Sequence, residues 1–371
     1  MKFRASRLAL LEAFNIAGSI VSQRPTRPVL ANIHLVVSSQ GTAELRSTDQ
    51  DTSIRFTVAL EEGAESGEAL LPAARVSSIL KECGTDDVAF ESDESGKVRI
   101  RSGRSRFQVL SENPAEFPDL PEFNEAASFG LEREKLHLLM SKTQFAIAKE
   151  KSRFAFNGAR LDIEGNLARM IATDGKRLAM KTTPIDNSDG VTASPIVPAR
   201  ALTVFDRVFN AEDDIVRVAL GEHQIMIKTA RAEVSSVLVE GNFPNYKAVI
   251  PAETTVNIRF PREELMRAFR QASLLTSQET RSVRMKVASG KAVLTAQALD
   301  AGEATIEIDA PDYPSEEEFS ISFNPDFFAE GLRNMDCEEI TLGLTKPNAQ
   351  AKITGEEDFV YVIMPVTMRN G

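Results

Sequence analysis

The chain has 371 residues, more than one hydrophobic core usually holds, so two or three domains are expected. Hydrophobic residues make up 42% and charged residues 26%, which excludes a disordered chain, and two distant cysteines argue against a disulfide framework and fit a reducing cytoplasm. The net charge of −11 argues against general nucleic-acid binding, although the placement of charges decides attraction more than their sum.

The first predicted element is a helix over residues 6–22. A basic start followed by an apolar run is also typical of a signal peptide, but Glu12 and Asn15 interrupt the run. Apolar residues recur there at helical spacing, which favours an amphipathic core helix. No other stretch approaches the ~20 apolar residues of a membrane span, so no membrane partner is expected.

This opening pattern occurs three times along the chain. An apolar, strand-like start at Phe3, Phe129 and Ile258 leads each time into a helical period. Pro72 and Pro198 stand at equal distances from the first two starts, each followed by a second helical segment whose first turn suits proline. The six predicted helices span residues 6–22, 73–82, 132–149, 199–209, 261–276 and 325–335.

Alternating segments between these helices predict strands. In the first copy they are residues 32–37, 43–47, 53–60, 88–91, 98–101 and 106–110, and in the second 158–163, 167–172, 215–219, 225–229 and 233–239. The fold class is therefore α+β, with three tandem copies of one domain. We place the domains at residues 1–126, 127–252 and 253–371.

Residues that could carry chemistry are few. The three histidines, His34, His137 and His223, have no metal-ligand spacing, so neither a metal nor a cofactor is expected. The polar segment 173–177 (TDGKR) could be a catalytic cluster around Asp174. A related segment, TDQD at 48–51, occupies the same position in the first copy, which favours a structural turn.

Charge is unevenly divided between the predicted elements. The six helices contain thirteen basic and nine acidic residues, so the acidic excess lies in strands and loops. Basic helices can contact phosphates without reading bases, and a small excess of charge predicts sliding contact and not tight grip.

Five strings along the chain match one known family: RPTRPVL at 24–30, RSGRSRF at 101–107, ATDGKRLA at 172–179, GNFPNY at 241–246 and YVIMP at 361–365. Through them the chain resembles the bacterial sliding clamps, the beta subunits of DNA polymerase III, over its whole length. The resemblance implies a head-to-tail homodimeric ring with antiparallel sheets outside and helices lining a pore. It implies a non-catalytic processivity factor of the cytoplasm that encircles double-stranded DNA without sequence specificity.

Several groups of residues follow from this resemblance. Partners would be a clamp loader, the replicative polymerase and other proteins that insert a short peptide with apolar and aromatic anchors. The implied peptide pocket comprises Phe156, Thr173, Gly175, Arg177, Leu178, Pro244, Val249, Val362, Met364 and Pro365. The implied dimer interface comprises Phe107, Val109, Leu274 and Leu275. The expected DNA contacts are Arg24, Arg75, Lys149, Arg153, Phe154, Arg200 and Arg207.

Three positions depart from what is common in the family: Ala155 replaces an aromatic residue, Lys176 a histidine and Ala248 an arginine. The tail also continues through residues 366–371. Two other functions compete with the clamp. One is an enzyme with its site around Asp174, Lys176 and Arg177, and the other is a monomeric repeat scaffold that binds only proteins.

Overall fold

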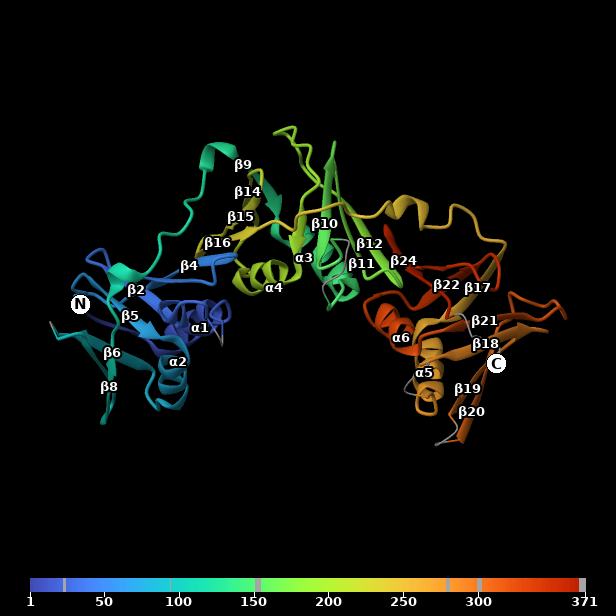
Figure 1. Ribbon diagram of the computed structural model, residues 1–371, viewed down its shortest axis with the longest axis horizontal. Coiled ribbons are helices and arrows are strands. Elements are labelled where there is room, and N and C mark those ends of the chain that lie inside the picture. Colours follow the sequence, from blue (N-terminus) through green and yellow to red (C-terminus); the bar gives the residue numbers. More distant parts are fainter. Residues whose placement is uncertain (23–24, 94, 151–154, 278–280, 299–301, 367–371) are drawn as a thin grey trace. The chain divides into compact units, whose positions relative to one another are not determined.

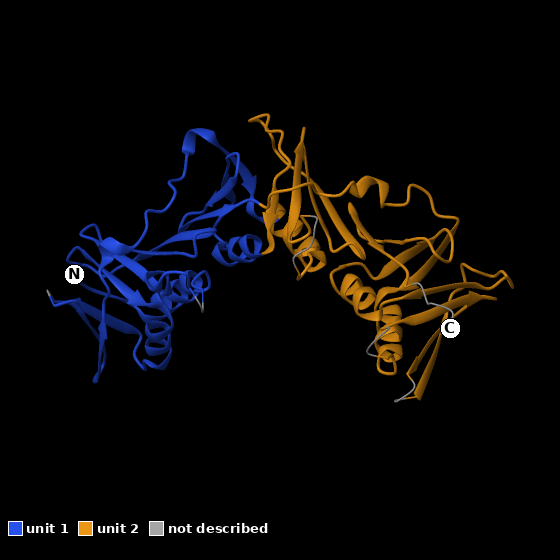
Figure 2. Cartoon of the chain, viewed as in Figure 1, with its two compact units in different colours: residues 1–134, 200–238 blue, residues 135–199, 239–371 orange. Residues whose placement is uncertain are grey.

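The computed structural model describes the chain except for residues 23–24, 94, 151–154, 278–280, 299–301 and 367–371 (Figure 1). The chain divides into two compact units (Figure 2). Unit 1 contains Met1–Glu134 and Arg200–Leu238, and unit 2 contains Lys135–Ala199 and Val239–Gly371. Each unit therefore contains one whole repeat and part of the middle repeat.

Unit 1 contains two antiparallel sheets. The four-stranded sheet has the order β1 (Lys2–Ser6), β6 (Asp87–Ser92), β7 (Lys97–Ser102) and β8 (Ser105–Leu110). The eight-stranded sheet has the order β5 (Gly67–Pro72), β2 (Asn32–Ser38), β3 (Thr42–Thr48), β4 (Thr52–Ala59), β16 (Ala232–Val237), β15 (Gln224–Lys228), β14 (Ile215–Leu220) and β9 (Ser128–Glu132).

Unit 2 has the same organisation. Its eight-stranded sheet has the order β13 (Ile196–Pro198), β10 (Gly158–Glu164), β11 (Leu167–Thr173), β12 (Arg177–Pro184), β24 (Phe359–Ile363), β23 (Ala351–Thr354), β22 (Glu339–Leu344) and β17 (Val256–Pro261). Its four-stranded sheet has the order β20 (Gly302–Asp309), β19 (Lys291–Ala298), β18 (Val283–Ala288) and β21 (Phe319–Phe323).

Adjacent repeats are joined strand to strand, at what we call the first and second joints. At the first joint β4 of repeat one pairs with β16 of repeat two, inside unit 1. At the second joint β12 of repeat two pairs with β24 of repeat three, inside unit 2. The outer strands of the four-stranded sheets are β1 and β8 in unit 1, and β20 and β21 in unit 2. β1 is bridged to Glu65 through Lys2, and Ser322 of β21 accepts from the Val366 amide, whereas β8 and β20 have no further strand beside them among the described residues.

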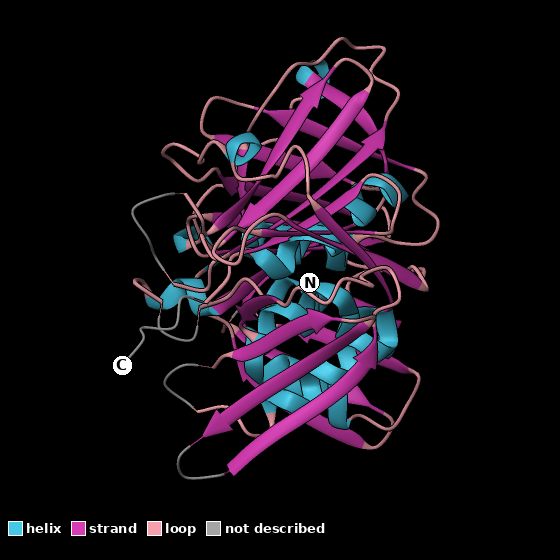
Figure 3. Ribbon diagram, turned by 90° about the vertical axis from the view of Figure 1, so that its right-hand side faces the viewer, coloured by secondary structure: helices cyan, strands magenta, loops and turns pink. Residues whose placement is uncertain are grey.

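The described residues form six α-helices, two per repeat, as the periodicity predicts. They are α1 (Arg7–Gly18), α2 (Ala73–Glu82), α3 (Arg133–Thr143), α4 (Ala199–Val208), α5 (Arg262–Ser273) and α6 (Pro325–Arg333). In repeat one α1 packs on α2 and on β2, β3 and β4. In repeat three α5 packs on α6 and on the four-stranded sheet, whose strands cross in front of helices in Figure 3.

Two helices start directly after the predicted prolines, and the largest differences from the predicted bounds are at the ends of α1 and α3. Helices α2 and α4 begin directly after Pro72 and Pro198. The predicted helix 6–22 ends at Gly18, and the predicted helix 132–149 ends at Thr143. Near each end a hydroxyl donates to a helical carbonyl, Ser19 to Ile16 at 2.7 Å and Thr143 to Leu139 at 2.7 Å. Such side-chain bonds compete with continuation of the helix.

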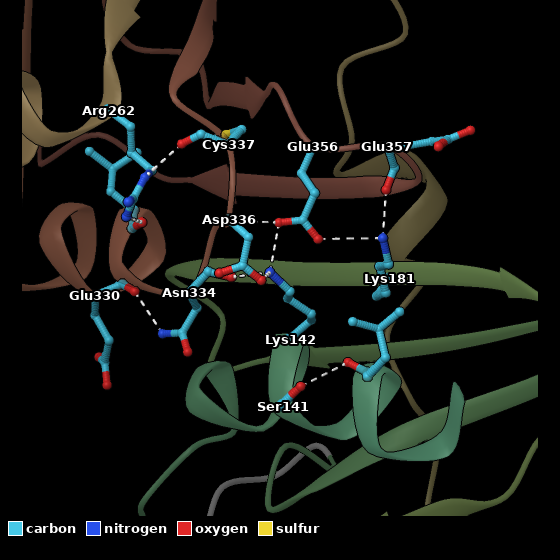
Figure 4. Close-up of polar contacts among 12 residues, drawn as sticks. Ser141, Lys142, Lys181, Arg262, Glu330, Asn334, Asp336, Cys337, Glu356 and Glu357 are labelled. Atoms are coloured by element: carbon cyan, nitrogen blue, oxygen red, sulfur yellow. Dashed lines mark hydrogen bonds and ion pairs between the residues drawn. The ribbon is translucent and has the colours of Figure 1, made fainter. Parts of the chain in front are cut away.

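The second joint contains a cluster of buried charges (Figure 4). Lys142 on α3 is 5% exposed, and its ammonium group donates to the Asn334 carbonyl at 3.0 Å, Asp336 at 2.6 Å and Glu356 at 2.7 Å. Lys181 on β12 donates to the Glu357 carbonyl at 2.6 Å and to Glu356 at 3.4 Å. All three ammonium protons of Lys142 have acceptors, as a buried lysine requires.

Candidate functional site

The predicted pocket residues meet in unit 2 around one small apolar cavity of about 100 Å³. Nine of the ten predicted residues line this cavity, which we call the apolar pocket. They are Phe156, Thr173, Gly175, Arg177, Leu178, Pro244, Val249, Val362 and Met364. Pro365, the tenth predicted residue, is not among the residues that line this cavity. Tyr246, which was missed, lines the cavity although it belongs to one of the matching strings.

Two neighbouring strands supply the floor of the apolar pocket, through Leu178 and Val362. Ile171 on β11, Leu178 on β12 and Val362 on β24 form one buried cluster with Tyr246. Leu178 lies directly opposite Val362 across the second joint, so their side chains share one face of the sheet. Met364 is 38% exposed and its amide donates to the Lys176 carbonyl at 2.8 Å. Such apolar walls suit the apolar side chain of a short peptide.

The turn beside the apolar pocket is built by Thr173 and Asp174. The Thr173 hydroxyl donates to the Arg177 carbonyl at 2.6 Å and accepts from the Gly175 amide at 3.0 Å. Asp174 Oδ1 accepts from the amides of Lys176 at 2.9 Å and Arg177 at 3.1 Å. Gly175 has φ +85°, and a Cβ there would lie 3.3 Å from the Phe156 ring. Glycine therefore provides both the left-handed backbone and the space beside Phe156.

The same turn occurs in unit 1. Thr48 donates to the Thr52 carbonyl at 3.0 Å and accepts from the Gln50 amide at 3.0 Å, while Asp49 Oδ1 accepts from the amides of Asp51 and Thr52. Gln50 has φ +85°, the value of Gly175 in the second copy. The recurrence predicted for this segment is confirmed at the level of individual hydrogen bonds. Asp174 is therefore a turn residue first, which counts against the enzyme alternative.

Arg177 lines the apolar pocket, but its guanidinium group is directed into a polar network. Its side chain is 3% exposed and donates to Asp174 at 3.0 Å, Glu330 at 2.6 Å and the Phe145 carbonyl at 2.8 Å. Burial opposes its charge, yet Tyr361, Glu330 and Asp174 more than offset burial, so the pKa of Arg177 is raised. The guanidinium therefore fixes the pocket wall, and carboxylates within the chain already satisfy it.

Tyr246 connects the apolar pocket to a charged neighbour. It is 5% exposed, and its hydroxyl donates to Asp162 Oδ2 at 2.9 Å. Asp162 also accepts from Arg160 Nε at 2.5 Å. Burial, followed by the hydrogen bond to Asp162, raises the pKa of the Tyr246 phenol. The phenol is therefore a hydrogen-bond donor at neutral pH.

Metal and membrane signals are absent from the described part of the chain. Among those residues no group of three or more His, Cys, Asp or Glu side chains could hold a metal ion. Within the same residues no helix combines the length and the apolar character needed to cross a bilayer.

Three family models for the DNA polymerase III beta subunit match this chain in order: the N-terminal domain at residues 1–121, the central domain at 130–245 and the C-terminal domain at 247–367. The chain belongs to the DNA polymerase III beta subunit family. It is 32% identical to the beta sliding clamp of Pseudomonas putida over 99% of this chain and all of that one. It is 30% identical to that of Escherichia coli K12 over the same shares.

Solved structures agree with this assignment. The sliding clamp of Pseudomonas aeruginosa bound to griselimycin matches with a TM-score of 0.92 and 29% identity, over 99% of this chain and all of that one. As a beta clamp the protein is a processivity factor and a non-catalytic accessory subunit of DNA polymerase III. The predicted family and the α+β fold of tandem clamp domains are both confirmed.

The expected DNA contacts of this beta clamp differ in their surroundings. Arg75 on α2, Arg207 on α4 and Lys149 after α3 are exposed. Arg200 is half exposed, and it forms an ion pair with Asp49 and a hydrogen bond to the Ile20 carbonyl. The remaining three expected contacts lie outside the described residues: Arg24, Arg153 and Phe154.

Some basic helix residues are already hydrogen-bonded within their own repeat. Arg7, Arg133 and Arg262 open the first helix of each repeat, and each donates to carbonyls at or just after the second helix of that repeat. Lys142 is buried in the ion cluster of the second joint. The count of thirteen basic helix residues therefore overstates the charge available to DNA, because a sequence does not reveal which arginines are already bonded.

The predicted interface residues of the clamp divide into exposed and buried positions. Leu274 is 79% exposed, and Leu275 and Phe107 are half-buried. Val109 is 2% exposed within its own chain, whereas its neighbour Leu110 is 66% exposed. The side chain of Val109 packs into the core of its own sheet, and that of the next residue, Leu110, is exposed.

Proposed function

We propose that two copies of this chain close head to tail into a ring around double-stranded DNA, with β8 of one copy pairing with β20 of the other. The observation that carries the proposal is the pairing rule of the joints. Each repeat contributes two groups of four strands, and each group ends in one outer strand. At both joints the outer strand of a repeat's first group pairs with the outer strand of the preceding repeat's second group: β16 with β4, and β24 with β12. Repeat one retains β8, repeat three retains β20, and the rule pairs these two.

The two free edges have complementary side chains. Exposed Arg101, Arg104 and Arg106 lie on or beside β8. Exposed Glu303, Glu307 and Asp309 lie on β20. Opposite charges at two edges favour their pairing with each other over pairing with themselves. A head-to-tail contact of this kind closes into a ring when the rotation per subunit fits a whole turn.

Apolar side chains beside these edges supply the remaining attraction. Leu110 and the half-buried Phe107 stand on β8, while Leu274 and Leu275 follow helix α5 in unit 2. A surface leucine that is 79% exposed in one chain gains by burial in a partner. The monomeric scaffold alternative leaves these leucines and both strand edges in water.

DNA would be held by enclosure and by phosphate contacts that read no sequence. Arg75, Lys149, Arg200 and Arg207 are the described residues we assign to this contact, and Arg24, Arg153 and Phe154 complete the set. Few exposed basic groups mean weak contacts that a moving duplex can exchange. Long residence on DNA then depends on the closed ring, whose three domains per copy we place at residues 1–126, 127–252 and 253–371.

The apolar pocket would receive the peptide of the replicative polymerase, of a clamp loader and of other DNA-processing proteins. Its shape and apolar floor favour one or two large apolar side chains as anchors. Ala155, Lys176 and Ala248 alter its surroundings relative to what is common in the family.

The first test measures the oligomer. Light scattering after size exclusion should give twice 40.7 kDa at micromolar concentration. Replacing Leu274 and Leu275 with lysine should give folded monomers, while Ile215→Lys, at another exposed apolar site (51%), should remain a dimer. A wild-type protein that is strictly monomeric, or a double variant that still dimerises, contradicts the proposed seam.

The second test measures enclosure. Protein loaded on circular DNA should remain bound through a high-salt wash and should leave when a nuclease linearises the circle. Retention on linear DNA with free ends would contradict topological binding and would indicate binding through direct contacts.

A further inference from the structure

A second cavity lies beside the apolar pocket and shares Pro244 and Tyr246 with it. Its volume is about 430 Å³, and five of its twelve lining residues are charged, Glu164 among them. Those used below are Arg160, Asp162, Arg169 and Lys247, and we call this space the charged cavity.

The two cavities follow one face of the eight-stranded sheet of unit 2. Arg160 on β10 lies directly opposite Ile171 on β11, and Ile171 belongs to the same buried cluster as Leu178 and Val362 of the apolar pocket. Asp162 lies opposite Arg169 in the same register. Opposed residues of an antiparallel pair point to the same side of a sheet. A ligand that leaves the apolar pocket across Pro244 and Tyr246 therefore meets charged side chains.

The two acidic residues that line this cavity, Asp162 and Glu164, already have partners within the chain. Asp162 is 8% exposed and accepts from Arg160 Nε and from the Tyr246 hydroxyl. Glu164 is mostly exposed and lies 3.6 Å from Arg169 Nη1. Neither carboxylate is left as an unneutralised charge facing an incoming group.

The basic residues retain donors. The hydrogen bonds of Arg160 found among the described residues use Nε, to Asp162, and Nη2, to Ser194 Oγ at 3.3 Å. Its Nη1 has no bond among those residues. Lys247 is exposed at the entrance, and the same described residues give its ammonium group no ion pair. The three basic side chains exceed the two acidic ones, so the cavity favours an anion.

We propose that the charged cavity binds a carboxylate of the partner peptide, carried by a residue next to the apolar anchor. This inference rests on the proposed function of the apolar pocket and extends it to a preference among partner peptides. The two cavities share Pro244 and Tyr246 as lining residues, so a peptide seated in the apolar pocket can extend into the charged cavity. We therefore take the peptide as the occupant of both. The charged cavity then distinguishes partners whose apolar anchors are alike, because a neutral flanking residue leaves the donors of Arg160 and Lys247 to water.

The experiment uses two pairs of fluorescent peptides with the same leucine-phenylalanine anchor. One pair carries Asp or Asn before the anchor, and the other carries Asp or Asn after it. Fluorescence anisotropy with the full-length protein measures the Kd of each. At one of the two flanks the Asp peptide should bind roughly threefold to tenfold more tightly than its Asn counterpart, and less so in high salt.

Variants assign the effect to the cavity. The double variant Arg160→Gln with Lys247→Gln removes both free donors and should bind both peptides of the pair equally, with the Kd of the Asn peptide unchanged. The double control Lys286→Gln with Lys346→Gln removes the same two positive charges from residues of unit 2 that do not line the charged cavity, and it should keep the full preference. Far-ultraviolet circular dichroism verifies that each variant is folded.

Each outcome separates the two proposals. Equal Kd values for Asp and Asn peptides at both flanks, or a preference that survives the double variant, overturn the charged cavity and leave the apolar pocket intact. If no peptide binds the wild-type protein, the apolar pocket fails and the charged cavity fails with it.

Discussion

The two joints between repeats share one backbone arrangement and differ in their side chains. At the second joint Leu178 faces Val362, and both line the apolar pocket. At the first joint the corresponding pair, one residue after the same turn, is Ser53 facing Ser235. The Ser53 hydroxyl bonds to Thr48 at 2.9 Å. Hydroxyl groups therefore stand where the second joint presents an apolar floor.

The charges at the joints differ as well. The β23–β24 turn contributes Glu356 to the buried Lys142 on α3. The β15–β16 turn contributes Arg231 to Glu12 on α1, at 3.1 Å, with side chains 31% and 46% exposed. The sign of each partner is reversed, and the pair of the first joint stays near water. The two joints thus share their strand pairing, whereas the second joint carries the apolar pocket and the more deeply buried ion pair.

The largest effect is expected from removing the buried charge of the second joint. Lys142→Met should lower the free energy of unfolding by about 3 kcal/mol, because Glu356, 15% exposed, loses its closest partner. Glu12→Gln at the half-exposed pair of the first joint should cost less than about 1 kcal/mol. Urea unfolding of both variants measures the difference, and equal costs would contradict the contrast between the joints.

The next effect comes from making the second joint resemble the first. Leu178→Ser should cost about 2 kcal/mol, at the lower end for a buried leucine because one side already faces a cavity. Peptide binding should be lost at the same time. Calorimetry and anisotropy on one preparation measure both, and Ser53→Ala, the matched position of the first joint, should bind peptide normally.

A smaller effect is expected from the phenol that borders both cavities. Tyr246→Phe keeps the ring in the apolar pocket but removes the donor to the buried Asp162, which should cost about 1 to 2 kcal/mol. Because the ring remains, an uncharged peptide should bind within about twofold of wild type. A free energy of unfolding that is unchanged or higher in Tyr246→Phe would show that Asp162 does not need this hydrogen bond.

The smallest effect concerns alkaline pH. All three tyrosines belong to unit 2, and burial raises the pKa of both Tyr246 and Tyr361 above the ordinary value. The folded chain therefore holds these phenolic protons more tightly than the unfolded chain does. Stability from this source is complete below about pH 10 and falls as the pH rises beyond that value. Thermal unfolding should show a smaller alkaline loss in Tyr246→Phe than in wild type.

Much of this organisation can be predicted from sequence because it is local or repeated. The helices after Pro72 and Pro198 follow from proline chemistry, and the paired TD turns follow from recurrence. The apolar pocket was assigned by resemblance, nine residues of ten. The alternation of apolar and polar residues also predicted strands with one solvent-exposed face, such as β7, in which every second residue is buried.

The remaining features depend on contacts between distant segments. Strand β12 was missed because its buried face carries Arg177, Lys181 and Thr183, so burial alternates there without an alternation of apolar residues in the sequence. Alternation also cannot decide which edge strand pairs with which, so neither joint was predicted. The inward orientation of Val109 and the bonded guanidinium of Arg177 follow from tertiary packing alone.

The unpaired strands β8 and β20 have a consequence for how the protein behaves in solution. A single copy has two different free edges, β8 and β20, and the proposed ring pairs one with the other. The same attraction that would close a pair can therefore also add copies end to end. Curvature alone decides between a closed pair and an open filament. Mutations that flatten a joint, even far from the seam, should therefore produce fibres instead of monomers.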